Sequence, residues 1–275
     1  MSEVTDAPLR ISTAPRPLQG SNVWYELMTT DPDAAKAFYG SVVGWTIGDP
    51  IPGGGQDYRM IERNDGGFAG GVLGLTEEMC EGGAFPLWIG YFGVDDVDAT
   101  VARIEAKGGT IQMAPFDIPQ GRIAMVTDPH GNPFYVMKPV PPEGQPDAQS
   151  DVFSATADQR VSWNELTTPD PNAARQFYGD VFGWTSDDFM PMGELGEYRF
   201  LAHAGTTIGA VCKPMPGGSN RWRYYVRVPS INEAVDAVKA AGGTVSMGPH
   251  EVPGGDHIVI GNDPQGAEFA LVGKA

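Results

Sequence analysis

The chain has 275 residues, enough for two domains, and its 35 acidic against 18 basic residues give a formal net charge of −17. Phosphate backbones and anionic membrane surfaces would repel so acidic a chain, so neither nucleic acid nor a membrane is expected as a partner. The two cysteines lack CxxC spacing and no apolar run is long enough to span a membrane, which together favour a soluble, cytoplasmic protein.

A tandem repeat organises the chain. Residues 24–47 (WYELMTTDPDAAKAFYGSVVGWTI) match residues 163–186 (WNELTTPDPNAARQFYGDVFGWTS) at a constant offset of 139, with fifteen of twenty-four positions identical. Near the end of each half, TDPHGNPF corresponds to NDPQGAEF. The repeat predicts a flexible N-terminal tail (1–20), a first domain (21–139), a linker (140–159) rich in Pro and polar residues, and a second domain (160–275).

Each half also contains a weaker internal repeat of strand, helix and further strands. The helix expected at 34–43 has apolar residues at helical spacing, with Asp31 as its N-cap and Pro32 as its first residue. Its predicted buried face consists of Ala35, Phe38, Tyr39, Val42 and Val43. Short β-prone segments follow at 44–47, 58–62 and 68–73. The sequence therefore predicts an α+β fold in which a βαβββ pattern is used four times.

These motifs resemble the vicinal oxygen chelate superfamily, which includes glyoxalase I, bleomycin-resistance proteins and extradiol dioxygenases. The resemblance rests on TxDPxAAxxFYxxxxGW after a strand, on the later VDDVDA helix and on the DPxGN turn, and it covers nearly all of residues 22–273. It implies two tandem domains, each a pair of βαβββ modules that forms a cup-shaped, mostly antiparallel sheet. Because one fold hosts unrelated chemistries, the resemblance leaves the activity open.

The resemblance also implies positions for metal ligands on the first, fifth and eighth strands of each half. Those positions hold Trp24, Ile89 and Tyr135 in the first half and Trp163, Arg223 and Ala270 in the second. Metal catalysis of the family type needs several His or Glu ligands around one ion, and these side chains supply none. We therefore expect no family-type metal site and no cofactor. A shift of register by one or two residues would bring in Glu26 or Glu165, but without a His partner.

Three residues of the second half form a weaker metal candidate. His250 and Glu251 are separated from His257 by Pro253-Gly254-Gly255, which could fold back as a hairpin. The spacing matches no known class of metal site, so a ligand role for these residues is not favoured.

Glu26 and Glu165 are the candidate catalytic residues. If the leucines that follow them face the helices, strand alternation turns both carboxylates toward the cup. A carboxylate on an apolar wall is costly unless it is paired. The favoured interpretation pairs Glu26 with Arg59 and Glu165 with Arg199. The alternative makes the glutamates proton acceptors or anchors for a ligand, with both arginines also in contact with it.

Four tryptophans at strand starts are candidate ligand-binding residues: Trp24, Trp88, Trp163 and Trp222. An indole offers an apolar face and one N–H to orient a ligand, although core packing is the alternative role. Trp45 and Trp184, at the corner between helix and strand, are predicted to lie in the core.

The sequence favours a monomer or homodimer that binds a small hydrophobic or aromatic molecule in its cups. The alternative is a glyoxalase-like lyase or isomerase that acts on an α-oxoaldehyde–thiol adduct with Glu26 or Glu165 as base.

Overall fold

The computed structural model describes residues 10–12, 17–53, 55–145 and 148–275. Residues 1–9 and 13–16 of the predicted tail and residues 146–147 of the predicted linker lie outside the described residues. The chain divides into two compact units. Unit 1 comprises residues 1–23, 90–150 and 163–222, and unit 2 comprises residues 24–89, 151–162 and 223–275. Each unit therefore takes segments from both sequence repeats.

Four βαβββ modules account for the main elements of the described residues. The first contains β1 (Asn22–Thr29), α1 (Pro32–Val43), β2 (Thr46–Ile47), β3 (Tyr58–Glu62) and β4 (Phe68–Gly74), and is followed by α2 (Glu77–Glu81). The second contains β5 (Leu87–Gly93), α3 (Val97–Ala106), β6 (Thr110–Ile118), β7 (Gly121–Thr127) and β8 (Pro133–Pro139). The third contains β9 (Val161–Thr167), α4 (Pro171–Phe182), β10 (Phe189–Pro191), the 3-10 turn η1 (Gly193–Leu195), β11 (Glu197–His203) and β12 (Thr206–Cys212). The fourth contains β13 (Arg221–Ser230), α5 (Ile231–Ala240), β14 (Thr244–Glu251), β15 (His257–Asn262) and β16 (Glu268–Lys274).

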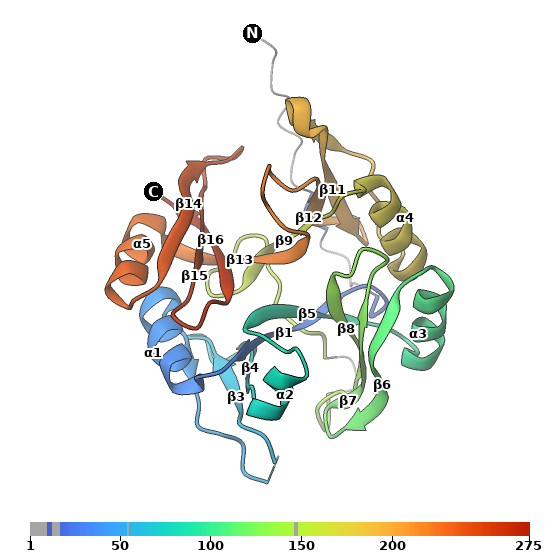
Figure 1. The fold of residues 1–275 in the computed structure, drawn as a ribbon, viewed down its shortest axis with the longest axis horizontal. Coiled ribbons are helices and arrows are strands. Elements are labelled where there is room, and N and C mark those ends of the chain that lie inside the picture. Colours follow the sequence, from blue (N-terminus) through green and yellow to red (C-terminus); the bar gives the residue numbers. More distant parts are fainter. Residues whose placement is uncertain (1–9, 13–16, 54, 146–147) are drawn as a thin grey trace. The chain divides into compact units, whose positions relative to one another are not determined.

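The described strands form two eight-stranded mixed sheets, one from β1 to β8 and one from β9 to β16. Each module contributes four neighbouring strands, such as β2-β3-β4-β1 and β10-β11-β12-β9. Within the first module, β2, β3 and β4 pair antiparallel, and β1 pairs parallel with β4. The predicted α+β class with mostly antiparallel pairing is confirmed. Figure 1 shows α1 beside α5 in unit 2, and α3 beside α4 in unit 1.

The first helix forms as its sequence predicts. The Asp31 carboxylate accepts a hydrogen bond from the Ala34 N–H at 2.9 Å, and Pro32 occupies the first turn. The five apolar residues of the predicted face are all buried. Gly44 ends the helix in the left-handed conformation, with φ 79°, where a side chain would be strained. The second repeat uses the same devices in α4, with Asp170 as the N-cap.

A buried hydrogen-bonded chain joins the two repeats inside unit 2. Trp88 Nε1 donates to the Tyr39 hydroxyl at 2.9 Å, and Tyr39 in turn donates to Asp263 Oδ2 at 3.0 Å. Burial raises the pKa of Tyr39 well above its ordinary value, and the neighbouring Asp263 charge raises it further. Burial also raises the pKa of Asp263. Tyr39 is therefore held neutral as a hydrogen-bond donor.

Unit 1 contains the matching chain. Trp222 Nε1 donates to the Tyr178 hydroxyl at 3.0 Å, and Tyr178 donates to Asp128 Oδ2 at 3.1 Å. The tyrosine of the first helix in each repeat thus donates to the aspartate of the Asp-Pro turn in the other repeat. Both the tyrosine and the aspartate lie in motifs that recur in the two repeats.

Further buried contacts involve the tryptophans predicted to lie in the core. Trp45 and Trp184 are both buried, as predicted, and their indole N–H groups donate to the backbone carbonyls of Gln159 and Gly20 at 3.0 and 2.8 Å. Within unit 1, the Thr207 N–H donates to the carbonyl of Arg10 in the N-terminal segment at 2.8 Å. The domain boundaries themselves stay a prediction. Among the described residues, no helix is both long enough and apolar enough to cross a membrane.

Candidate functional site

Two aromatic side chains and a glutamate form a hydrogen-bonded chain on one face of the β9–β12 strands. Trp163 Nε1 donates to the Tyr198 hydroxyl at 2.8 Å, and Tyr198 donates to Glu165 Oε2 at 2.8 Å. The Trp163 and Tyr198 rings are parallel within 4°, and Phe200 meets both rings edge-on at 5.9 Å between centroids. We call Trp163, Glu165, Tyr198 and Phe200 the Glu165 face.

The Glu165 face combines a buried carboxylate with partly exposed rings. Glu165 is only 8% exposed, whereas Trp163, Tyr198 and Phe200 are of intermediate burial. Residues two apart on a strand share a face, which explains why Trp163 and Glu165 lie together on β9, and Tyr198 and Phe200 on β11. The arrangement can hold a flat apolar group against the rings while the carboxylate accepts a hydrogen bond from it.

The first repeat has a related arrangement in unit 2. Trp24 Nε1 donates to the Tyr58 hydroxyl at 2.8 Å, and Glu26 on the same face of β1 is 3% exposed. Glu26 lies opposite Gly71 of β4, and a Cβ at Gly71 would overlap the Tyr58 hydroxyl. The glycine therefore makes room for the tyrosine ring beside the carboxylate.

The expected pairs of Glu26 with Arg59 and of Glu165 with Arg199 are replaced by other ion pairs. Arg59 binds Asp57 through two nitrogens at 2.8 Å and binds Asp33 at 2.6 Å. Arg199 binds Glu197 at 2.7 Å. Because neighbouring strand residues face opposite sides, Tyr58 and Tyr198 take the faces with the glutamates and turn the arginines away from them.

Trp88 and Trp222 do not join the faces that hold the glutamates. Each donates to the buried tyrosine of a helix, Trp88 to Tyr39 of α1 and Trp222 to Tyr178 of α4. Alternation along β5 and β13 puts them on the helix side of the strands, where they pack in aromatic clusters. The structure thus places only Trp24 and Trp163, of the four candidate tryptophans, beside a glutamate.

Neither Tyr58 nor Tyr198 is among the site residues predicted from the sequence. The signal was present, because each directly precedes an arginine on a strand and so faces the opposite side from it. Whether the tyrosine or the arginine of each strand lies beside the glutamate depends on the pairing register of β3 and β11. That register comes only from the structure.

Known proteins match the chain over both repeats. Residues 23–136 match the model of the glyoxalase/bleomycin resistance protein/dioxygenase superfamily, and residues 163–272 match that of a glyoxalase-like domain. Over 262 residues the chain is 34% identical to "Putative glyoxylase CFP32" of Mycobacterium tuberculosis (strain CDC 1551 / Oshkosh), covering 94% of this chain and 96% of the relative. The chain belongs to the glyoxalase/bleomycin resistance protein/dioxygenase superfamily.

Two further similar proteins are matched over nearly the full chain. The anthracycline biosynthesis protein DauV of Streptomyces sp. (strain C5) is 38% identical over 270 residues, with 92% of this chain and 93% of that protein covered. The Mn(II)-bound glyoxalase of Novosphingobium aromaticivorans superposes with a TM-score of 0.60 at 18% identity, covering 93% of this chain and 83% of that one. At that identity the superposition establishes a shared fold.

Metal-dependent superfamily members raise the question of whether this chain could hold an ion. At the positions that the resemblance assigns to ligands, the Trp163 indole N–H is donated to Tyr198, and Arg223 Nε is paired with Glu268 at 2.9 Å. Ile89 and Ala270 are apolar and buried. Within the described residues, no group of three or more His, Cys, Asp or Glu side chains is placed to hold a metal ion. The side chains at these positions therefore do not fit a family-type metal triad.

The candidate metal site of His250, Glu251 and His257 does not form either. Glu251 lies opposite His257 across the β14–β15 pair, but His250 is its neighbour along the strand and faces the other side. His203 is buried, and its Nε2 lies 2.8 Å from the Gln19 carbonyl.

Proposed function

We propose that the protein binds a small aromatic molecule on the Glu165 face, with a hydroxyl or similar donor of the ligand bound to Glu165. The observation that carries the proposal is the chain from Trp163 through Tyr198 to Glu165 Oε2. Tyr198 has a single proton, and it is directed at the carboxylate. An ionised carboxylate has about four acceptor positions, so a ligand donor can share Glu165 with Tyr198.

The partly exposed rings support an aromatic ligand. Aromatic pairs in offset or edge-to-face contact contribute about 0.5–1.5 kcal/mol beyond the area they bury. The orientation of Trp163, Tyr198 and Phe200 is fixed by their mutual contacts, which lowers the cost of ordering them on binding. Similarity to DauV, which is named as an anthracycline biosynthesis protein, also supports a polycyclic aromatic compound as ligand.

The test is isothermal titration calorimetry with 2-naphthol and with naphthalene, which lacks the hydroxyl. We expect Glu165→Gln to weaken 2-naphthol binding about tenfold, since a hydrogen bond to a charged group contributes about 1.5–3 kcal/mol, and to leave naphthalene binding unchanged. Trp163→Ala should weaken both. The matched control in the other repeat, Trp24→Ala, should change neither. No measurable binding of either compound by the wild-type protein at millimolar concentration would refute the proposal.

A glyoxalase-like lyase is the second candidate. It is supported by the near-complete burial of Glu165, a carboxylate that could take a proton from a carbon next to a carbonyl group, and by the similarity to a protein named as a glyoxylase. Tyr198 would hold the carboxylate in position, and no step runs through a metal ion. Turnover of a methylglyoxal–thiol adduct that disappears in Glu165→Gln but persists in Glu26→Gln would favour this activity. Equal rates in wild-type and Glu165→Gln would dismiss it.

A further inference from the structure

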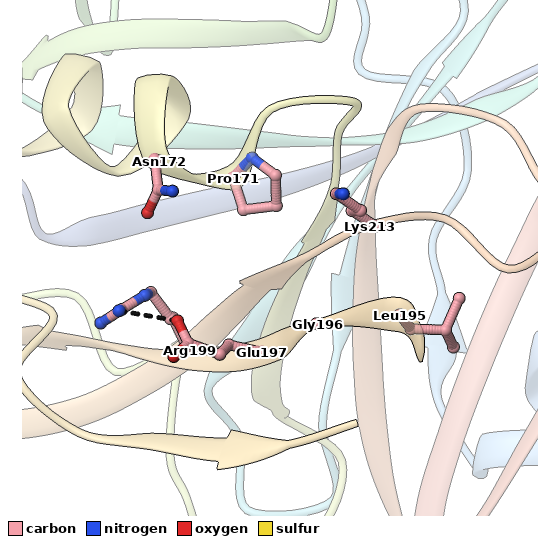
Figure 2. A pocket seen from close by; sticks show the side chains of 7 residues that line it. All are labelled: Pro171, Asn172, Leu195, Gly196, Glu197, Arg199 and Lys213. Atoms are coloured by element: carbon pink, nitrogen blue, oxygen red, sulfur yellow. Dashed lines mark ion pairs between the residues drawn. The ribbon is translucent and has the colours of Figure 1, made fainter. Parts of the chain in front are cut away.

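A cavity lies in unit 1 at the start of α4. Its volume is about 350 Å³, and its lining includes Pro171 and Asn172 of α4, Glu197 and Arg199 of β11, and Lys213 just after β12. Figure 2 shows Asn172 and Pro171 on one side of this cavity, Arg199 and Glu197 on the other, and Lys213 at one end. Arg199 follows Tyr198 directly on β11, so the cavity lies on the opposite side of the strand from the Glu165 face.

The arginine in this cavity is only partly paired. Arg199 Nη2 binds Glu197 at 2.7 Å, and the guanidinium lies over the Phe189 ring with its carbon 5.1 Å from the centroid. Arg199 Nε is buried and has no hydrogen-bond partner within the described part of the chain. The guanidinium of arginine is a planar fork of five N–H donors, so Arg199 keeps donors besides the one bound to Glu197. A carboxylate or phosphate group can bind such a fork through two oxygens.

Lys213 adds a second cation. Its side chain is exposed, and among the described residues it forms no ion pair. Two cations therefore face one carboxylate, Glu197, in the cavity lining. This local excess of positive charge stands out in a chain whose formal net charge is −17.

The corresponding place in the first repeat has the opposite balance of charge, with more carboxylates than cations. Arg59 there meets two carboxylates, Asp57 and Asp33, and is 5% exposed. Gly74 occupies the position of Lys213, and a Cβ at Gly74 would lie 3.0 Å from the Asp57 Cβ and 3.1 Å from Pro32 Cγ. In the first repeat, the charge of Arg59 is therefore neutralised by carboxylates, and the side chains around Gly74 leave no space for a larger residue.

Two differences between the repeats create the cavity's charge. Asn172 stands where the first repeat has Asp33, which removes a carboxylate, and Lys213 stands where it has Gly74, which adds an ammonium group. The repeats share the arginine and its strand, so the fold alone does not require these changes.

We infer that this cavity is a binding site for a small oxyanion, a molecule bearing a carboxylate or phosphate group that binds the Arg199 fork and Lys213. The site is separate from the Glu165 face, and the inference does not rest on the proposed function. The overall negative charge of the chain repels anions at other places, so measured anion binding should report on this site.

The test converts the second repeat to the charge pattern of the first. Wild-type protein in Tris chloride buffer is titrated with inorganic phosphate and with succinate by calorimetry, and we expect a dissociation constant of about 1 mM or below for at least one of them. Phosphate binding alone would identify a phosphate ligand, succinate binding alone a carboxylate ligand, and binding of both an oxyanion site of either kind. The double variant Asn172→Asp/Lys213→Gly should bind at least tenfold more weakly.

Both substitutions are at exposed positions, so the fold should survive, and an unchanged far-ultraviolet circular dichroism spectrum checks this. The matched control Asp33→Asn in the first repeat should leave anion affinity unchanged. Equal affinity of the wild-type protein and the double variant, or no binding of either anion by the wild-type protein, would overturn the inference.

Discussion

Arg59 and Arg199 occupy equivalent positions in the two repeats but have different surroundings. Arg59 is enclosed by a bidentate Asp57 and a second carboxylate, Asp33. Arg199 keeps one carboxylate, Glu197, and its side chain is 21% exposed at the edge of a cavity. The comparison shows how a duplicated structural residue can become available to a ligand when its partners change. A buried arginine enclosed by two carboxylates stabilises the fold, and an arginine that has one carboxylate and lies in the same cavity as a lysine retains the capacity to bind an anion.

The largest difference between the repeats should appear on removal of the principal carboxylate. Asp57→Asn should destabilise the protein by about 2–3 kcal/mol, because it leaves the nearly buried Arg59 without its bidentate partner. Glu197→Gln should cost less than about 1 kcal/mol, because Arg199 is accessible to water. Urea denaturation of both variants measures the two values. Equal losses would mean that the two arginines have the same role.

The buried tyrosine chains should also respond unequally. Tyr39→Phe removes the hydroxyl that donates to Asp263 Oδ2, and we expect a loss of about 2 kcal/mol. Tyr178→Phe should cost about 1 kcal/mol, because Asp128 Oδ2 also accepts from Asn132 Nδ2 at 2.8 Å. Thermal unfolding of the two variants tests the order, and a larger loss for Tyr178→Phe would contradict it.

The contribution of Asp57 to the stability of the fold should depend on pH. Its hydrogen bond from Arg59 lowers the pKa of Asp57 in the folded protein below the ordinary value of 3.8. Its stabilising contribution is therefore fully present above about pH 4 and is lost as the pH falls through the lowered folded pKa. The stability gap between wild-type protein and Asp57→Asn should be largest at pH 7 and should narrow toward pH 3. A gap that is constant between these pH values would show that Asp57 does not act through its charge.

The smallest expected effects concern a device that both repeats share. Asp31→Ala and Asp170→Ala each remove an N-cap, and each should cost about 1 kcal/mol. Both caps accept a hydrogen bond from the N–H three residues along the chain, and Asp170 also accepts one from the Asn172 N–H, so the two losses should agree within about 0.5 kcal/mol, with Asp170→Ala the larger. A large difference between them would show that the repeats diverge in local helix stability as well as in their charges.

Local patterns in the sequence were sufficient to predict helices and strands. The spacing of apolar residues and the Asp-Pro caps predicted α1 with its buried face, because those signals act within one turn of helix. The contact between Tyr39 and Asp263 was not predicted, since it joins residues 224 positions apart. The only sign of this contact in the sequence is that the motif containing Tyr39 and the motif containing Asp263 each recur in both repeats.

The site was predicted less well than the fold. The sequence singled out Glu165 and Trp163, which the structure joins through Tyr198, but it assigned Arg199 to the same face. A shift of one residue along a strand reverses the face on which a side chain lies. The pairing register that decides the face cannot be read from the sequence of a single strand. Lys213 carried no signal, because its meaning depends on Arg199 being short of partners.

The most direct test of ligand binding at the Glu165 face is a crystal structure of the protein soaked with 2-naphthol. We expect density for the naphthyl ring against Trp163 and Phe200, with the ligand hydroxyl about 3 Å from a Glu165 carboxylate oxygen. Density for the ring at Trp24, or with its hydroxyl away from Glu165, would contradict the assignment of binding to the Glu165 face.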